Sequence, residues 1–231
     1  MTRIGVVTGL IAEADCLRRS PALESANLDF RFACSGGRPE KSASAATSLA
    51  AEGCQGLLSF GLAGGLTPDL KPGDLIAASD VVDPSGQIYA ADGRWRENVI
   101  TAASSLPISI VQVAGEDTVL ATPADKQALR ARTGAAAVDM ESHAVARAAD
   151  AAGIPFLVLR AVADPASHGI PGAALSGLGA DGRTRPLGVA AGLAVRPWQL
   201  PALIRLGMES RAGFAALSRV AGVGSALFRL V

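Results

Sequence analysis

The chain has 231 residues, of which 49% are hydrophobic, 18% charged and 4% aromatic, and its formal net charge is zero. This apolar fraction is enough for a large core and excludes a wholly disordered chain, while the balanced charge and the few aromatic residues argue against nucleic-acid binding. No apolar run approaches the roughly 18 residues of a membrane span, and a short apolar core followed by Glu13 makes the N-terminus a poor signal peptide.

Strand-like and helix-like segments alternate along the first 165 residues. The β-branched run 3–8 predicts a first strand, and residues 11–19 predict a helix that ends before a proline. Further strands are expected over residues 28–34, 55–60, 74–82, 108–114, 135–138 and 155–163, and further helices over 39–52, 123–132 and 140–152. This alternation predicts an α/β fold with three layers, α/β/α, and a mostly parallel central mixed sheet.

The composition changes after Asp164. Residues 166–231 hold seven arginines and two acids, a net charge of +5, so residues 1–165 carry −5. A stretch rich in glycine and proline comes first, and helical segments are expected from about Leu187 and from Gln199. The segment is too apolar for a linker, so we treat residues 1–231 as a single domain that includes it.

Acidic residues gather where the predicted strands end. Ligands bind at the carboxyl ends of strands in parallel α/β sheets, and residues 9–13, 61–65, 115–120 and 139–141 fall there, as does Asp164. Four of these five places, all but residues 115–120, have an ordinary structural explanation: an exposed helix acid, a tight turn, acids that cap a helix, an Asp-Pro turn. Taken together, they place Glu13, Glu141 and Asp164 at one edge of one sheet.

Carboxyl groups in this arrangement favour the cleavage of a glycosidic bond. One acid protonates the leaving group, and another activates the attacking water. Apolar neighbours would raise the pKa of Glu13 and suit it to act as a base. An N-glycoside gives Asp164 a role, because adenine leaves well only once its N7 is protonated. The GLAGG segment, residues 61–65, would let the backbone approach a ligand closely.

The scarce residue types argue against other chemistry. His143 and His168 are the two histidines, and neither has an evident nucleophile as a partner, so a Ser-His-Asp hydrolase fits poorly. The three cysteines form no CxxC pair, which argues against a zinc site and fits buried thiols in a reduced, cytoplasmic protein. We expect no metal and no cofactor.

A resemblance to a known family rests on three blocks: RIGVVTGLIAEAD, SFGLAGGLTPDLKPGDLIAASDVV and AVDMESHAVARAADAAGIPFLVLRAVAD. Over about residues 1–165 they resemble the purine nucleoside phosphorylase superfamily, with a nearer likeness to its methylthioadenosine/S-adenosylhomocysteine nucleosidase branch. The resemblance implies that Glu13 activates water, that Glu141 holds the ribose hydroxyls and that Asp164 is the acid at N7. The other substrate-binding residues it implies line the pocket, pack on the sugar or face the base: Ala63, Gly64, Val119, Asp139 and Met140.

Some positions depart from that family pattern. Leu62 and Ala163 stand where the nucleosidases usually carry serine. Bacterial phosphorylases hold phosphate with arginines, and this chain has Glu13 and Ser59 near those positions. A carboxylate there repels phosphate and favours water, with inorganic phosphate as the alternative co-substrate. The region before Pro39 is also shorter than usual, with one strand in place of a hairpin.

The C-terminal pattern DGRTRP…RPWQLPALIRL resembles the hopanoid-associated nucleoside phosphorylases. That likeness implies release of adenine from adenosylhopane in hopanoid biosynthesis, and a rigid C30 hydrocarbon on the 5′ carbon requires an apolar pocket mouth. An apolar segment rich in arginine suits peripheral contact with an anionic membrane; it equally suits a helix that completes the core or the interface of the homodimer that the resemblance implies. The alternatives are a methylthioadenosine/S-adenosylhomocysteine nucleosidase and a non-catalytic nucleoside- or lipid-binding protein.

Overall fold

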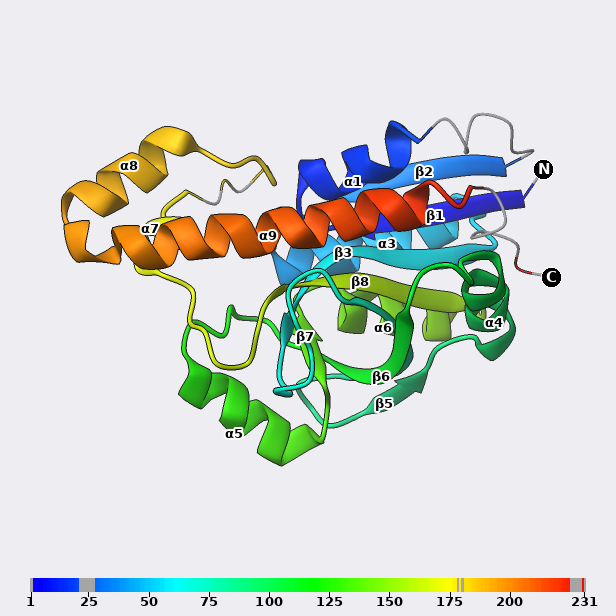
Figure 1. The fold of residues 1–231 in the computed structure, drawn as a ribbon. Helices are drawn as coiled ribbons and strands as arrows, with labels where there is room; N and C mark the ends of the chain where they lie inside the picture. The colour runs from blue at the N-terminus through cyan, green and yellow to red at the C-terminus, as the bar shows by residue number, and fades with distance from the viewer. Residues whose placement is uncertain (1, 21–27, 178, 180, 225–229, 231) are drawn as a thin grey trace.

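The computed structural model describes residues 2–20, 28–177, 179, 181–224 and 230, and in it eight strands form a sheet with helices on both faces (Figure 1). The strands are β1 (Thr2–Thr8), β2 (Leu28–Cys34), β3 (Gly56–Gly65), β4 (Leu75–Val82), β5 (Ile88–Ala90), β6 (Ile108–Gly115), β7 (Ala137–Asp139) and β8 (Phe156–Asp164). The helices are α1 (Ile11–Arg18), α3 (Pro39–Ala51), α4 (Gly93–Ala102), α5 (Pro123–Thr133), α6 (Ser142–Ala152), α7 (Gly172–Leu175), α8 (Pro186–Ala194) and α9 (Leu200–Ala221), with a 3-10 turn, η1 (Pro197–Gln199).

The sheet is mixed and mostly parallel, as expected. Its order is β2-β1-β3-β7-β6-β4-β5, and β8 pairs with both β3 and β4. Strands β3, β8, β4, β6 and β7 therefore close into a ring, in which the β3–β7 and β4–β8 pairs are antiparallel and the other three are parallel. The alternation of strands and helices did not predict this closure, because it does not say which strands pair.

The two largest apolar clusters lie on the two faces of the sheet. On β1, Ile4 and Val6 pack in a cluster with residues of α1 and α9, whereas Val7 packs with residues of α3 and α6. Successive side chains of a strand point to opposite faces, so this split separates the two helical layers. Figure 1 shows α1 and α9 on the near face and α3 and α6 on the far face. The three-layer prediction is confirmed.

Several element boundaries correct the expectations from the sequence. β3 continues through Gly65, so the GLAGG segment is the second half of a strand and not a turn that follows it. Helix α6 begins at Ser142 and not at Met140, because Asp139 Oδ1 accepts the backbone N–H of Glu141 at 3.0 Å and that of Ser142 at 2.8 Å. This is the capping role expected of Asp139. Strand β5 and helix α4 were not predicted at all.

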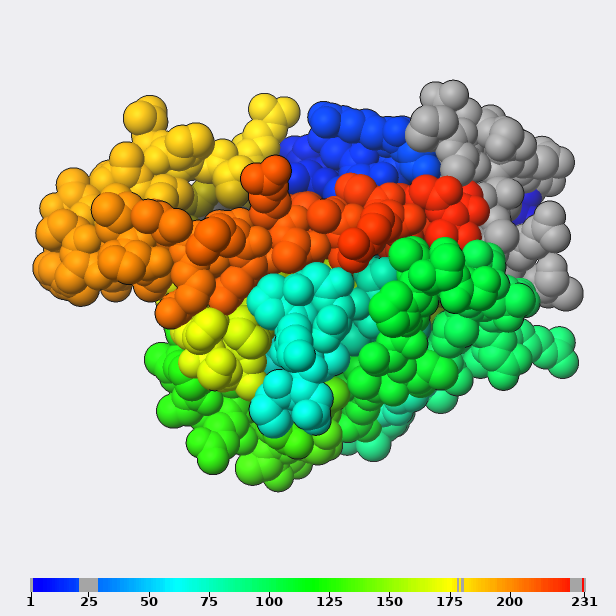
Figure 2. All heavy atoms as spheres, viewed as in Figure 1, coloured from blue at the N-terminus to red at the C-terminus, as the bar shows by residue number. Residues whose placement is uncertain are grey.

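The C-terminal segment forms an angled arm, residues 181–210. The second half of α9 packs in the core through Ala216, Leu217 and Val220, while its first half projects beyond the sheet together with α8 (Figures 1 and 2). No single described helix is long and apolar enough to cross a membrane; α8 and Pro197–Ala221 meet that criterion only jointly, with a bend of 119° between them.

The thiols are less buried than expected. Cys54 is buried, but Cys16 and Cys34 are partly exposed. Cys34 Sγ lies 3.3 Å from the backbone oxygen of Gly9, next to the cavity described below.

Candidate active site

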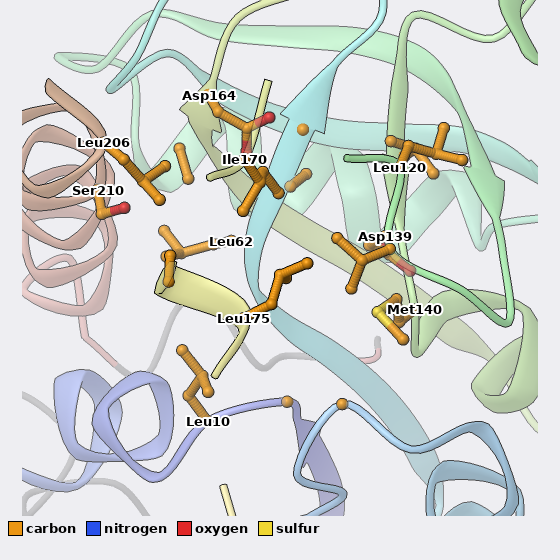
Figure 3. A pocket seen from close by; sticks show the side chains of 18 of the residues that line it. Leu10, Leu62, Leu120, Asp139, Met140, Asp164, Ile170, Leu175, Leu206 and Ser210 are labelled. Carbon is orange, nitrogen blue, oxygen red and sulfur yellow. The ribbon is translucent and has the colours of Figure 1, made fainter. Parts of the chain in front are cut away.

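A cavity of about 290 Å³ opens where the strands of the ring end (Figure 3). All the catalytic and substrate-binding residues predicted from the sequence lie on its wall: Glu13, Ala63, Gly64, Val119, Asp139, Met140, Glu141 and Asp164. They come from α1, from β3, from the segment after β6, from the β7–α6 junction and from the end of β8. The structure thus brings every candidate together, and the role of each one stays a prediction.

Glu13 lies in the first turn of α1, where backbone N–H groups hold its carboxylate. Oε2 accepts the N–H groups of Gly9 and Leu10 at 2.8 Å each, and Oε1 accepts that of Leu62 at 2.8 Å. Burial raises the pKa of Glu13, opposed by the charge of Arg160 and by these three hydrogen bonds. The carboxylate is therefore fixed in orientation while its pKa is raised.

Two glycines leave room for the carboxylates. A Cβ on Gly61 would lie 2.6 Å from Glu13 Cδ and 2.6 Å from Arg160 Nη1, and a Cβ on Gly9 would lie 2.7 Å from Glu141 Oε1. Carbon atoms do not approach other heavy atoms so closely without displacing them. The first glycine of the GLAGG segment is thus required by close packing around Glu13.

Arg160 is fully buried beneath the acidic residues, and we did not identify it from the sequence. Its Nε lies 2.8 Å from Asp139 Oδ2, and its Nη2 donates to Ser59 Oγ at 2.6 Å and to Glu141 Oε2 at 3.3 Å. A buried guanidinium needs carboxylate partners. The signal was present in the sequence: Arg160 is the one charged residue in the apolar run 155–163, so acids had to lie against it.

Glu141 titrates close to neutral pH. Burial raises its pKa to about 7, with Arg160 opposing and the negative charges of Asp139 and Glu13 adding to the rise. Its Oε1 accepts a hydrogen bond from Ser35 Oγ at 3.2 Å. Near neutral pH this group can therefore both accept and donate hydrogen bonds to a polyhydroxylated ligand.

Asp164, the last residue of β8, pairs with a buried lysine. Lys126 Nζ contacts Asp164 Oδ2 and also donates to the backbone oxygens of Pro165 at 2.8 Å and His168 at 3.0 Å. Burial raises the pKa of Asp164, and the ammonium of Lys126 opposes that rise. Lys126 was also missed, because a lysine within a polar helix gives no sign in the sequence that it is buried.

The rest of the cavity wall is mostly apolar. Figure 3 shows Leu10, Leu62 and Met140 around the opening. A roof comes from the chain after residue 165: Ile170, Ala174, Leu175, Gly177, Thr184, Leu206 and Ser210. The acidic side of the cavity, formed by Glu13, Asp139, Glu141 and Asp164, is called the acidic floor below. A cavity with an acidic floor and a mostly apolar roof is suited to a ligand with a polar end and an apolar end. Among the described residues, no group of three His, Cys, Asp or Glu side chains could hold a metal ion.

Comparisons with known proteins identify a superfamily. A family model described as the phosphorylase superfamily matches residues 30–177. An aminodeoxyfutalosine nucleosidase of Campylobacter jejuni is 28% identical over 150 residues, which span 57% of this chain and 66% of that relative, slightly less than two thirds of its length.

Solved structures of nucleosidases share the fold. A 5′-methylthioadenosine/S-adenosylhomocysteine nucleosidase from Neisseria meningitidis superposes with a TM-score of 0.74 at 18% identity, covering 96% of this chain and 98% of that one. A futalosine hydrolase of Helicobacter pylori superposes with a TM-score of 0.66 at 18% identity, covering 95% and 97%. At these identities the likeness establishes the fold alone.

Proposed function

The chain belongs to the phosphorylase superfamily, and from that premise we propose that it is an enzyme that cleaves the N-glycosidic bond of an adenine nucleoside. The observation that carries the proposal is the convergence of Glu13, Glu141 and Asp164, all buried, on one cavity. The relatives reported above are named as nucleosidases or hydrolases, which supports the same reaction class.

Each carboxyl group has a task in this reaction. Asp164 gives its proton to N7 of adenine as the bond between C1′ and N9 breaks, and the electron pair of that bond leaves with the base. Water attacks C1′ and loses a proton to Glu13, whose Oε1 accepts one backbone hydrogen bond and retains a lone pair for that water. Glu141 holds the ribose hydroxyls.

The acidic floor favours water over phosphate as the nucleophile that attacks C1′. The buried guanidinium of Arg160 is committed to Asp139, Ser59 and Glu141. A phosphate dianion at the position of the water would face the carboxyl groups of Glu13 and Glu141. The one cationic side chain among the described lining residues, Lys126, is paired with Asp164. We therefore propose hydrolysis, and phosphorolysis is the alternative that the experiment below separates.

The substrate that we favour carries a large apolar group on its 5′ carbon, and adenosylhopane fits that description. The mostly apolar roof over the acidic floor supports this, because residues 166–210 line the cavity with the aliphatic side chains of Ile170, Leu175 and Leu206. Leu62, which stands where the nucleosidases usually carry serine, adds to the apolar wall. Methylthioadenosine or S-adenosylhomocysteine is the alternative substrate, and either would leave much of that roof without ligand contacts.

We also propose that residues 166–210 touch a membrane surface. Of the nine large hydrophobic side chains that are exposed in the described residues, seven belong to it: Leu175, Leu187, Val195, Trp198, Leu200, Ile204 and Met208. Exposed arginines lie among them at positions 183, 185, 196 and 205. Apolar side chains interspersed with cations suit an anionic bilayer. A homodimer interface is the other occupant that such a surface fits.

Sedimentation with lipid vesicles separates these two occupants. We expect the protein to sediment with phosphatidylglycerol vesicles and not with phosphatidylcholine vesicles, and Trp198→Glu to abolish that sedimentation. Ile88→Glu, which changes an exposed apolar residue on β5, should leave it intact. If Trp198→Glu instead converts a dimer to a monomer in sedimentation velocity, the surface is a subunit interface.

Adenine release tests the function directly. Methylthioadenosine and a long-chain 5′-alkyl adenosine are each incubated with the protein, with and without phosphate, and adenine is measured by chromatography. We expect adenine from the long-chain substrate without phosphate. Equal or better release from methylthioadenosine would favour the smaller substrate class, and a requirement for phosphate would overturn hydrolysis. No adenine from either would leave a non-catalytic binding protein as the better account.

A further inference from the structure

The buried ammonium of Lys126 has a partner for each of its three N–H donors. Two are backbone oxygens, of Pro165 and His168, and the third is Asp164 Oδ2. The lysine side chain is 1% exposed. Burying an ammonium is costly unless it is paired, and two backbone oxygens alone would leave its charge without a counterion. The lysine is therefore tied to the carboxylate and not only to the backbone.

This contact makes the two oxygens of Asp164 unequal. Oδ2 faces Lys126, while no donor among the described residues is hydrogen-bonded to Oδ1, and the side chain lies on the cavity wall (Figure 3). Lys126 comes from α5, whereas Asp164 ends β8. The helix thus clamps one oxygen and leaves the other for a ligand.

We propose that Lys126 is a positioning residue for N-glycosidic cleavage: it orients Asp164 toward the base and stabilises the carboxylate that remains when the proton of Asp164 passes to N7. This inference rests on the proposed function. The lysine keeps its own proton throughout, so the step transfers one proton from Asp164 to the base and changes no other charge. A cation in contact with a developing carboxylate in a water-poor site lowers the barrier to that transfer.

The other charged groups that face Asp164 cannot substitute for Lys126. Glu209 on α9 adds a negative charge that raises the pKa of Asp164, and His168 acts in the opposite sense. His168 Nδ1 lies 2.6 Å from Glu209 Oε1, and Arg205 Nε lies 4.0 Å from the same oxygen, so these groups are paired with one another. Lys126 is the one described cation in direct contact with Asp164.

The test compares three variants in adenine release across the pH range. Lys126→Met removes both the charge and the hydrogen bonds, Lys126→Gln removes the charge but keeps a donor, and Lys71→Met makes the same change at an exposed lysine. We expect Lys126→Met to lower kcat about tenfold or more and to move the alkaline limb of the kcat profile to higher pH, because Asp164 then ionises less readily. KM should change less than kcat.

The conservative variant separates charge from orientation. Lys126→Gln should retain more of the kcat than Lys126→Met, because the amide still holds Oδ2, yet it should show a similar shift of the alkaline limb. Lys71→Met should match the wild type. If thermal unfolding shows that Lys126→Met is not folded, the comparison of Lys126→Gln with the wild type is the test.

A second measurement does not depend on turnover. The carboxyl 13C resonance of Asp164, assigned with Asp164→Asn, should titrate at higher pH when Lys126 is replaced. The role of Lys126 would be overturned, with the proposed function intact, by one result: the wild type releases adenine, but the folded Lys126 variants shift neither the alkaline limb of the kcat profile nor the titration of Asp164. A wild type that releases no adenine would overturn the proposed function, whatever the titration shows.

Discussion

Arg160 Nε lies 2.8 Å from Asp139 Oδ2, and the two side chains are 0% and 1% exposed. The guanidinium also contacts Glu141, and its charge acts on Glu13, so one cation offsets three buried acids. Arg160→Met would leave those charges without a partner, and we expect it to destabilise the fold by about 3–5 kcal/mol.

Urea unfolding of Arg160→Met measures that loss. Arg3→Met is the matched control, because Arg3 pairs with Asp29 near the surface, where such pairs contribute little. An equal loss of unfolding free energy in the two variants would contradict the view that Arg160 stabilises the buried acids.

Gly61→Ala should displace Glu13. The added methyl would lie 2.6 Å from the carboxyl carbon of Glu13, so we expect a loss of about 1–3 kcal/mol from overpacking, and a loss of activity from the displaced carboxylate. Gly207→Ala adds the same methyl in open space on α9, where alanine favours the helix by up to about 1 kcal/mol. Adenine release and urea unfolding of both variants check this, and normal activity in Gly61→Ala would contradict the packing argument.

The titration of Glu141 should make stability depend on pH. Its pKa is raised from 4.5 to about 7, so in that window the folded chain holds a proton that the unfolded chain releases. The stabilisation is therefore fully present below about pH 4.5 and is lost as the pH rises toward 7, by up to about 1.4 kcal/mol per pH unit for one proton.

Thermal unfolding between pH 4.5 and 8 measures this dependence. Glu141→Gln should flatten the fall in Tm with rising pH, because the amide does not titrate. Glu97→Gln makes the same substitution at an exposed position and should keep the wild-type slope. Buried Glu13 and Asp164, whose pKa values are also raised, act in the same direction in every variant.

Asp164→Asn should abolish most of the activity while preserving the fold. The asparagine can keep its oxygen toward Lys126 and turn its amide toward the cavity, so we expect the fold to be retained. Tm should fall, because the buried ammonium of Lys126 loses its counterion, and no proton can pass to N7. We expect adenine release to fall by about 10² to 10⁴-fold. Unchanged turnover would mean that another group protonates the base.

Glu13→Gln should cost both activity and stability. The carboxylate accepts three backbone N–H groups on its two oxygens, and a glutamine would place its own amide donors against one of them. Activity should again fall by about 10² to 10⁴-fold, with a lower Tm than that of the wild type. A Glu13→Gln variant as stable as the wild type would contradict the hydrogen bonds described for Glu13.

Much of this site was predictable from the order of strands and acids in the sequence. Parallel strands end at one edge, so residues as far apart as Glu13 and Asp164 could be placed together without coordinates. The buried cations were harder. Arg160 points inward from a strand and Lys126 from a helix, and which side chains are buried depends on the packing of elements distant in the sequence. Ring closure depends on pairing between β4 and β8, which strand spacing does not specify.

The floor and the roof of the cavity come from separate parts of the chain. All the acids of the floor precede residue 165 and lie at the ends of strands or at the starts of helices. The roof, which includes Ile170, Leu175 and Leu206, follows residue 165. On the proposed function, substitutions confined to the cavity-lining residues after 165 should therefore change which nucleosides the cavity accepts, while the acidic floor keeps its composition.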